Sequence, residues 1–230
     1  MKILLEHGAA THVGKVKQNN EDTFATNGDK RLFIVADGMG GHDNGEQASR
    51  IAVDRFENKF DHTSGQREES MRQAIEHAQK IVHIINKQRH GNMGTTLTGL
   101  HIDERGNAYI AHAGDSRGYT FNIKGRLQQL TTDHVIPQLN ILTQFVGNPT
   151  HFEPQVLRNW ETKNGDVFLL CTDGLTNHIG NRGLAKVLRM VSQGRVSPQS
   201  AADRLIEMAN AAGGRDNITA LIVRVKHIAH

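Results

Sequence analysis

One stretch decides the fold, and it reads Arg31-Leu32-Phe33-Ile34-Val35-Ala36-Asp37-Gly38-Met39-Gly40-Gly41-His42. The short apolar, partly β-branched run in its first half predicts a buried strand, and the glycine cluster that follows predicts a turn. Residues 166–174 repeat the pattern, because a second apolar run is followed there by Asp173 and a glycine. A single aspartate and glycine after a strand are more often an ordinary turn. The repeat favours a chemical role, since two predicted strands present Asp37 and Asp173 in the same way.

Length and composition indicate one globular domain. The chain has 230 residues, of which 37% are hydrophobic and 22% are charged, and these fractions are ordinary for globular proteins. The net charge is +3, and the basic residues are scattered along the chain. Scattered basic residues are weak grounds for nucleic-acid binding. We therefore expect no nucleic-acid partner.

The sequence also indicates the compartment. Cys171 is the only cysteine and lies inside an apolar run, so no internal disulfide can form, which favours a core thiol in a reducing compartment. The apolar residues 3–5 are interrupted by Glu6, and no apolar run approaches the ~20 residues that a membrane helix needs. We expect a cytoplasmic protein without a signal peptide or a membrane span.

The remaining periodicity alternates between strands and helices. Strands are predicted within 9–26, at 94–102 and 107–113 as a hairpin, at 119–121 and at 218–225, and amphipathic helices at 45–60, 66–87, 182–190 and 198–212. Residues 134–156 show no clear periodicity. Loops of this length inside a compact domain tend to be functional or mobile.

Aspartates gather at the ends of the predicted strands. Four of them form a candidate cluster, Asp22, Asp37, Asp173 and Asp216, with Asp115 and Asp133 as outliers. Carboxylates a few ångströms apart repel each other, so such a cluster persists only if cations hold it together. Oxygen ligands without cysteine or paired histidine favour Mg²⁺ or Mn²⁺, and two such ions can activate a water for attack on phosphorus. The alternative is that these acids lie apart on the surface.

Several short motifs follow one another in a fixed order along nearly the whole chain. They are residues 13–22, Asp37-Gly38-Met39-Gly40-Gly41-His42, residues 45–49, Gly94-Thr95-Thr96, Gly114-Asp115-Ser116-Arg117, residues 130–134, Gly165-Asp166 with Cys171-Thr172-Asp173-Gly174, and Asp216-Asn217-Ile218-Thr219. This ordered set resembles the bacterial branch of the metal-dependent type 2C serine/threonine protein phosphatases. It implies an α+β fold, a four-layer αββα sandwich of two mainly antiparallel sheets flanked by helix pairs. It also implies hydrolysis of phosphoserine and phosphothreonine by a water that bridges two metal ions, without a phosphoenzyme.

The resemblance also implies roles for the acids nearest the metals. Asp37 matches the ligand that both metals share, the carbonyl oxygen of Gly38 matches a ligand of one of them, and Asp173 and Asp216 match ligands of the other. The implied cofactors are two Mn²⁺ or Mg²⁺ ions.

Further roles follow from the same resemblance. Glu21 and Asp22 match an acidic pair that holds metal-bound waters. Asp115 and Asp133 match positions that bind a third, weaker metal. Asn217 matches a residue that supports the loop carrying Asp216.

The chain departs from the family at two places. Lys17 stands where the family has an arginine that binds phosphate, and a lysine is a point charge without the bidentate fork of a guanidinium. Residues 140–147 resemble the segment that normally follows a longer helical flap. We therefore expect a single phosphatase catalytic domain over residues 1–230, with a shortened flap around 135–155.

Two rival interpretations come from the residues themselves. Residues 114–118 match the Gly-x-Ser-x-Gly elbow of serine hydrolases, with Ser116 as nucleophile and Asp133, His134, Asp173 and His178 downstream. That elbow needs a helix after the serine, whereas 119–121 predict a strand. The other rival is a catalytically silent, phosphatase-like module that binds phosphoproteins.

The implied partners are phosphorylated protein substrates and a cognate bacterial serine/threonine kinase whose signalling the enzyme opposes. We also expect a monomer.

Overall fold

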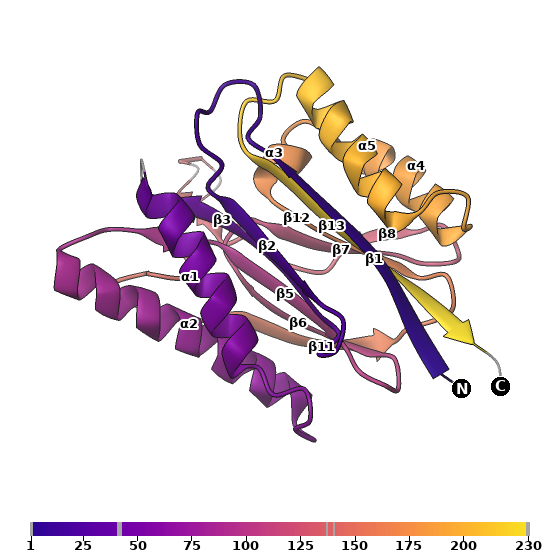
Figure 1. The fold of residues 1–230 in the computed structure, drawn as a ribbon, viewed down its shortest axis with the longest axis horizontal. Helices are drawn as coiled ribbons and strands as arrows, with labels where there is room; N and C mark the ends of the chain where they lie inside the picture. The colour runs from indigo at the N-terminus through magenta and orange to yellow at the C-terminus, as the bar shows by residue number, and fades with distance from the viewer. Residues whose placement is uncertain (1, 41–42, 137, 140, 229–230) are drawn as a thin grey trace.

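The computed structural model describes residues 2–40, 43–136, 138–139 and 141–228, and Figure 1 shows their arrangement. Two stacked β-sheets form the centre, with helices on the outer face of each. All the paired strands are antiparallel. Gly41 and His42, the end of the predicted aspartate and glycine motif, lie outside the described residues.

One sheet has five strands in the order β1 (Lys2–His12), β13 (Ile218–Ile228), β12 (Val167–Cys171), β7 (Arg117–Phe121) and β8 (Leu127–Gln129). The other sheet has six, in the order β11 (Gln155–Glu161), β6 (Asn107–Ala113), β5 (Leu97–Ile102), β3 (Leu32–Met39) and β2 (Asp22–Asn27), if the short β4 (Gly94–Thr95) that pairs with β3 is counted. A small separate hairpin joins β9 (Val135–Ile136) and β10 (Ile141–Leu142).

The helices cover the two outer faces. Helices α1 (Asp43–Lys59) and α2 (Arg67–Arg89) lie on the six-stranded sheet, and α4 (Asn181–Ser192) and α5 (Pro198–Ala211) lie on the five-stranded sheet (Figure 1). The short α3 (Asp173–Thr176) follows β12 directly. This arrangement confirms the predicted αββα sandwich. None of the described helices combines the length and apolar composition that crossing a bilayer requires.

Strand β3 shows why its sequence is a continuous apolar run. Leu32 and Ile34 point into the core beneath α1 and α2, whereas Phe33 and Val35 point into the core between the sheets. Side chains alternate across a strand, so a strand covered on both faces needs apolar residues at every position. Each such side chain contributes about 1.5–3 kcal/mol by burial.

Strand β12 repeats this pattern. Leu169 and Cys171 pack beneath α4 and α5, and Phe168 and Leu170 pack between the sheets. Cys171 is fully buried, and burial raises the pKa of its thiol to about 12. The prediction of a core thiol is therefore confirmed.

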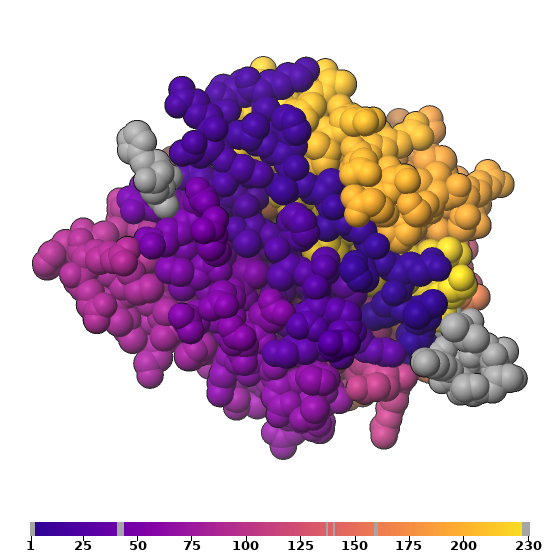
Figure 2. Space-filling view, in the orientation of Figure 1, coloured from indigo at the N-terminus to yellow at the C-terminus, as the bar shows by residue number. Residues whose placement is uncertain are grey.

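The ends of the chain meet in one sheet. Strand β1 pairs with β13 from Lys2 opposite Ile228 to His12 opposite Ile218. Figure 2 shows the result from outside, with the indigo N-terminal segment beside the yellow C-terminal part of the chain. The predicted start of the first strand, near Ala9, was wrong, because the residues before it do not alternate between apolar and polar and so carry no strand signal.

The predicted helices are confirmed to within two residues at each end. Helix α5 begins where Ser197 caps it, since the Ser197 hydroxyl oxygen accepts from Ser200 N–H (3.1 Å) and Pro198 occupies the first turn.

The expected turn directly after Asp37 is wrong. Strand β3 continues to Met39 because its end changes partner, and Gly38 then pairs with Thr95 of β4. A side chain at Gly38 would overlap the carbonyl oxygen of Gly45, so glycine is needed here for a close approach of backbones. Asp37 therefore lies within a strand, where both neighbouring segments fix its backbone.

Candidate metal centre

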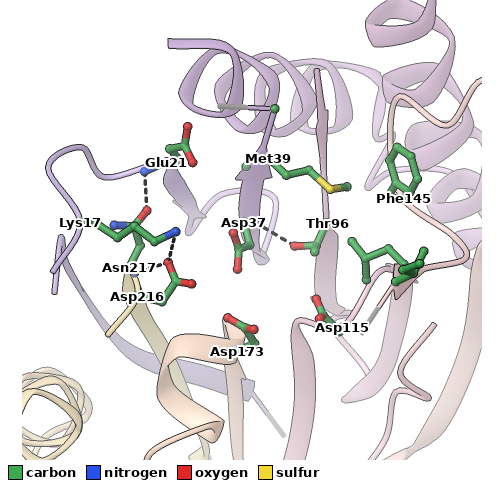
Figure 3. Close-up of a pocket in the computed structure, with 14 residues that line it drawn as sticks. Lys17, Glu21, Asp37, Met39, Thr96, Asp115, Phe145, Asp173, Asp216 and Asn217 are labelled. Atoms are coloured by element: carbon green, nitrogen blue, oxygen red, sulfur yellow. Dashed lines mark hydrogen bonds and ion pairs between the residues drawn. The ribbon is translucent and has the colours of Figure 1, made fainter. Parts of the chain in front are cut away.

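A cavity of about 550 Å³ lies between segments of both sheets, and carboxylates dominate one side of it (Figure 3). The acids that line it come from five places in the sequence, Glu21, Asp37, Asp115, Asp173 and Asp216. Figure 3 shows the side chains of Asp37, Asp115, Asp173 and Asp216 pointing toward one another. The structure thus brings together acids that are up to 195 residues apart in the sequence (216 − 21). Among the acids of the candidate cluster and its outliers, the alternative that they lie apart on the surface is therefore wrong for Asp37, Asp115, Asp173 and Asp216.

Asp37 lies in the middle of this group. Its backbone N–H donates to Thr96 Oγ1 (2.9 Å), and its carbonyl oxygen accepts from Thr95 Oγ1 (2.9 Å). Burial, followed by repulsion from Asp22 and Asp173, raises the pKa of Asp37 well above its usual range. A carboxylate held in this position is stabilised in its charged form only if a cation lies beside it.

Asp22 is the most deeply buried of the acids predicted for the metal site, with 7% of its surface exposed. It pairs with Asp37 across strands β2 and β3. Its Oδ2 accepts from Thr172 Oγ1 (2.9 Å) and Thr219 Oγ1 (2.7 Å). Its Oδ1 is buried without a hydrogen-bond partner among the described residues. Burial raises the pKa of Asp22 to about 7, although both threonine hydrogen bonds act in the opposite direction.

Asp173 and Asp115 complete the acidic side. Asp173 Oδ2 accepts from Asn177 Nδ2 (3.0 Å), whereas Asp173 Oδ1 is buried without a partner in the described part of the chain. Burial, with repulsion from Asp216, raises the pKa of Asp173. Burial and repulsion from Asp173 raise the pKa of Asp115 to about 6. Two unsatisfied carboxylate oxygens therefore lie in or next to the cavity.

These residues fit hard divalent cations. All the candidate ligand atoms are oxygens, and the Gly38 backbone also lines the cavity. Burial raises the pKa values of Asp22, Asp37 and Asp173, so a cation beside these carboxylates would stabilise their charged form. No three His, Cys, Asp or Glu side chains among the described residues converge into a complete ligand set.

Asn217 ties the segment before β13 to the segment before β2. Its Oδ1 accepts from Glu21 N–H (2.8 Å), and its Nδ2 donates to the carbonyl oxygens of Val13 (3.0 Å) and Asn19 (2.9 Å). Its backbone N–H donates to Asp216 Oδ1 (2.9 Å). One buried side chain thereby positions both segments that carry cavity acids.

Lys17 lines the cavity at its edge. Its Nζ lies 2.8 Å from Asp216 Oδ1, and the two side chains are 44% and 41% exposed. The hydrogen bond to Asp216 raises the pKa of Lys17 above its ordinary value, so Lys17 is charged at neutral pH. The sequence did not reveal this ion pair, because 199 residues separate its members (216 − 17).

Asp133 is not among the described residues that line the cavity. Its carboxylate binds Arg117, with Oδ1 and Oδ2 accepting from Nε (2.9 and 3.0 Å) and Oδ2 from Nη2 (2.6 Å). Gln129 Nε2 donates to Asp133 Oδ1 (2.9 Å) as well. Arg117 therefore holds the carboxylate of Asp133, whereas Asp115, the other residue predicted for a third metal, lines the cavity.

The serine-hydrolase interpretation is wrong. Ser116 is fully buried, and its hydroxyl hydrogen-bonds Thr96 Oγ1 (2.7 Å). His134 Nδ1 accepts from Gly114 N–H (3.3 Å), and His178 Nδ1 lies 3.0 Å from the Gly174 carbonyl oxygen. Strand β7, and not a helix, follows the serine.

Sequence reasoning missed the threonines around the acids and the apolar side of the cavity. Thr172 and Thr219 donate hydrogen bonds to Asp22 Oδ2. Phe145 faces the acids from across the cavity (Figure 3). Thr172 directly precedes Asp173 and Thr219 lies two residues after Asn217, and this closeness to predicted site residues is the signal that could have indicated them. Phe145 lies in the segment without periodicity and carried no signal.

Comparisons with known proteins agree with this site. Residues 10–210 match the sequence profile of the family described as protein phosphatase 2C. The chain is 32% identical over 241 residues to the serine/threonine phosphatase Stp of Listeria monocytogenes, covering 93% of each protein. It is 31% identical over 246 residues to the protein phosphatase PhpP of Streptococcus pneumoniae, covering 95% of this chain and 97% of that protein.

Solved structures give the same result. The serine/threonine phosphatase PstP/Ppp of Mycobacterium tuberculosis superposes with a TM-score of 0.87 at 27% identity, covering 97% of this chain and 99% of that one. The catalytic domain of PstP in complex with two manganese ions has a TM-score of 0.86 at 28% identity, covering 98% and 100%. Fold and site thus define a protein of the bacterial serine/threonine phosphatase class. The chain belongs to the protein phosphatase 2C family.

Proposed function

We propose that this chain is a metal-dependent protein phosphatase that hydrolyses phosphoserine and phosphothreonine on proteins. The observation that carries the proposal is the convergence of Asp37, Asp115, Asp173 and Asp216 on one cavity, in a chain of this family. Hydrolysis transfers the phosphoryl group to water: the bond from phosphorus to the serine or threonine oxygen breaks, and that oxygen takes up a proton.

We assign the metal-holding role to Asp37, the Gly38 carbonyl oxygen, Asp173 and Asp216, all of which line the cavity. Two Mn²⁺ or Mg²⁺ ions bound there would supply an activated water and neutralise charge on the phosphoryl oxygens. The manganese ions of PstP support this choice of metal.

The other residues position and balance charge. Glu21 borders the cavity and Asp22 lies beside Asp37, which suits both for orienting water molecules. Lys17 offers its ammonium group to the phosphoryl oxygens at the edge of the cavity, with Asp216 as its partner when no substrate is bound. Asn217 holds the two segments in place. A third, weaker metal would rely on Asp115, which lines the cavity, and on Asp133, which would first have to leave Arg117.

We further propose that residues 1–230 act as one catalytic domain whose flap is reduced to the β9–β10 hairpin and the residues around it. The family profile spans residues 10–210, which supports a single unit. We expect a cytoplasmic monomer that acts on phosphoproteins and opposes a cognate serine/threonine kinase.

The direct test compares the wild-type chain with Asp37→Asn. Phosphate release from a phosphothreonine peptide in Mn²⁺ should be lost in the variant, because asparagine removes the central charge while keeping the shape of the side chain. Binding of the peptide by the wild type without any turnover would indicate a phosphoprotein-binding module and refute the proposal.

A further inference from the structure

The side of the cavity that faces the acids is apolar. Met39, Ile141, Leu142 and Phe145 line it, and Figure 3 shows Met39 and Phe145 across the cavity from Asp216 and Lys17. The phosphoryl chemistry uses none of these side chains. The apolar wall, defined here as Met39, Ile141, Leu142 and Phe145, therefore needs another explanation.

Phe145 is held firmly in this wall. Its ring lies over Gly94, where a Cβ atom would come within 2.8 Å of the ring, so only glycine leaves room for it. The next residue, Val146, exchanges two backbone hydrogen bonds with Thr95 (2.9 Å each), and Gly147 N–H donates to Gln79 Oε1 (2.5 Å). The backbone that carries Phe145 is thus fixed to β4 and α2, and the ring forms a preformed surface.

The same ring borders a second hollow. Phe145 also lines a cavity of about 420 Å³ between the C-terminal half of α2 and residues 145–149, with His83, Lys87 and Pro149 among its other walls. The two hollows therefore share Phe145 as a common wall.

The sequence beside the wall is uncharged, and some of its apolar side chains are exposed. Residues 135–147 contain no Asp, Glu, Lys or Arg. Ile141 is 52% exposed and Leu139 62% exposed. Exposed apolar side chains gathered next to a proposed active site indicate a binding surface more often than chance.

We propose that the apolar wall is a substrate subsite, which receives an apolar side chain next to the phosphoserine or phosphothreonine. This inference rests on the proposed phosphatase function. The apolar side chain that occupies this subsite belongs to the substrate, because the phosphoryl group has to enter the acidic side of the cavity. Neighbouring residues of an extended substrate chain are only about 3.3–3.6 Å apart. The residues that flank the phosphorylated one are therefore within reach of Phe145 and Ile141.

The test uses two phosphothreonine peptides that differ only in the residues on both sides of phosphothreonine, leucine in one and glycine in the other. Wild type should show a kcat/KM about tenfold higher for the leucine peptide, in the range for apolar pockets. Phe145→Ala and Ile141→Ser should both lower this ratio toward one. Because Ile141 is half-exposed, its variant tests the subsite even if Phe145→Ala fails to fold.

The matched control is Ile123→Ala. Ile123 is also exposed (55%), but it borders a different hollow near Lys124 and Asp166. Its variant should keep the wild-type ratio. Loss of the ratio in Ile123→Ala as well would show a nonspecific effect and overturn the assignment.

The outcomes separate the two proposals. Turnover of neither peptide in Mn²⁺ refutes the phosphatase function, and the subsite with it. Equal kcat/KM for both peptides in wild type, or a ratio that neither wall variant lowers, overturns the subsite alone. A dimer in sedimentation experiments that Ile141→Ser dissociates without changing the ratio would assign the surface to a second copy of the chain and likewise overturn it.

Discussion

Replacing Asn217 by alanine removes the side chain that joins two segments of the site. The side chain is buried (3% exposed) and makes one acceptor and two donor hydrogen bonds, to Glu21 N–H and to the carbonyl oxygens of Val13 and Asn19. After the substitution these three backbone groups lose their partner. We expect both lower stability and lower activity, because the segments that carry Lys17 and Asp216 lose their shared anchor.

The magnitude follows from the surroundings of the three groups. Asn19 is exposed, so water can replace the lost bond to its carbonyl oxygen at little cost. Glu21 and Val13 are half-buried, and each group left without a partner costs about 1 kcal/mol or more. The expected loss is therefore about 2 kcal/mol, which for a chain of this size lowers Tm by roughly 4–8 °C.

Asn217→Asp is the matched variant. An aspartate keeps an acceptor for Glu21 N–H, but its second oxygen faces the two carbonyl oxygens that Asn217 Nδ2 now binds. It also adds a negative charge beside Asp216. Its stability should therefore be lowest at neutral pH and recover as the pH falls and the carboxyl gains a proton, whereas the alanine variant should show no such recovery relative to wild type.

Urea unfolding and thermal unfolding in excess Mn²⁺ measure both variants. A free energy of unfolding for Asn217→Ala within about 0.5 kcal/mol of wild type would refute the reasoning, because that is the range of ordinary surface substitutions.

Three further predictions concern the acids, the cavity edge and the close approach at Gly38. In the unfolded chain the Asp22 carboxyl has its ordinary pKa of 3.8, whereas burial raises this pKa to about 7 in the folded chain. The folded state therefore binds more protons between these values, and its stability falls as the pH rises through this window. In chelator, wild type should therefore lose stability relative to Asp22→Asn from about pH 4 to pH 7; a difference that stays constant with pH contradicts this. Lys17→Ala should change the free energy of unfolding by less than about 1 kcal/mol, because the ion pair of Lys17 with Asp216 is half-exposed. It should nevertheless raise KM for a phosphopeptide. An unchanged KM would show that Lys17 does not contact the substrate. Gly38→Ala should lower the free energy of unfolding by at least about 2 kcal/mol because its Cβ would overlap Gly45, and wild-type Tm in this variant would disprove the close approach.

The sequence carried most of the fold because its apolar runs and helical stripes are strong. Strands β3 and β12 are apolar at every position since both faces are covered, and α5 has a proline and a serine at its start. Their existence was therefore predictable. The extension of β3 through Met39 was not, because it depends on the pairing of Met39 with Gly94, a residue 55 positions later (94 − 39).

The site was predictable in part. The ordered motifs indicated the acids, and the cavity contains Asp37, Asp115, Asp173 and Asp216. Tertiary contacts could not be predicted from the sequence. The spacing of the residues does not show that Arg117 donates hydrogen bonds to both carboxylate oxygens of Asp133. The apolar wall was missed for a similar reason, since contacts with β4 and α2, and not a local pattern, hold Val146, Gly147 and Asn148 beside Phe145.

The most direct measurement is phosphate release from a phosphothreonine peptide as a function of Mn²⁺ after complete removal of divalent ions. The carboxylate cavity predicts no turnover in chelator and full recovery on adding Mn²⁺, with no recovery in Asp37→Asn. It also predicts that Mn²⁺ raises the Tm of wild type, because the ions bind only the folded state and relieve the repulsion among Asp37, Asp173 and Asp216. Undiminished turnover in chelator, or Mn²⁺-dependent turnover in Asp37→Asn equal to that of wild type, would contradict the assignment of this cavity as a metal-dependent phosphatase site.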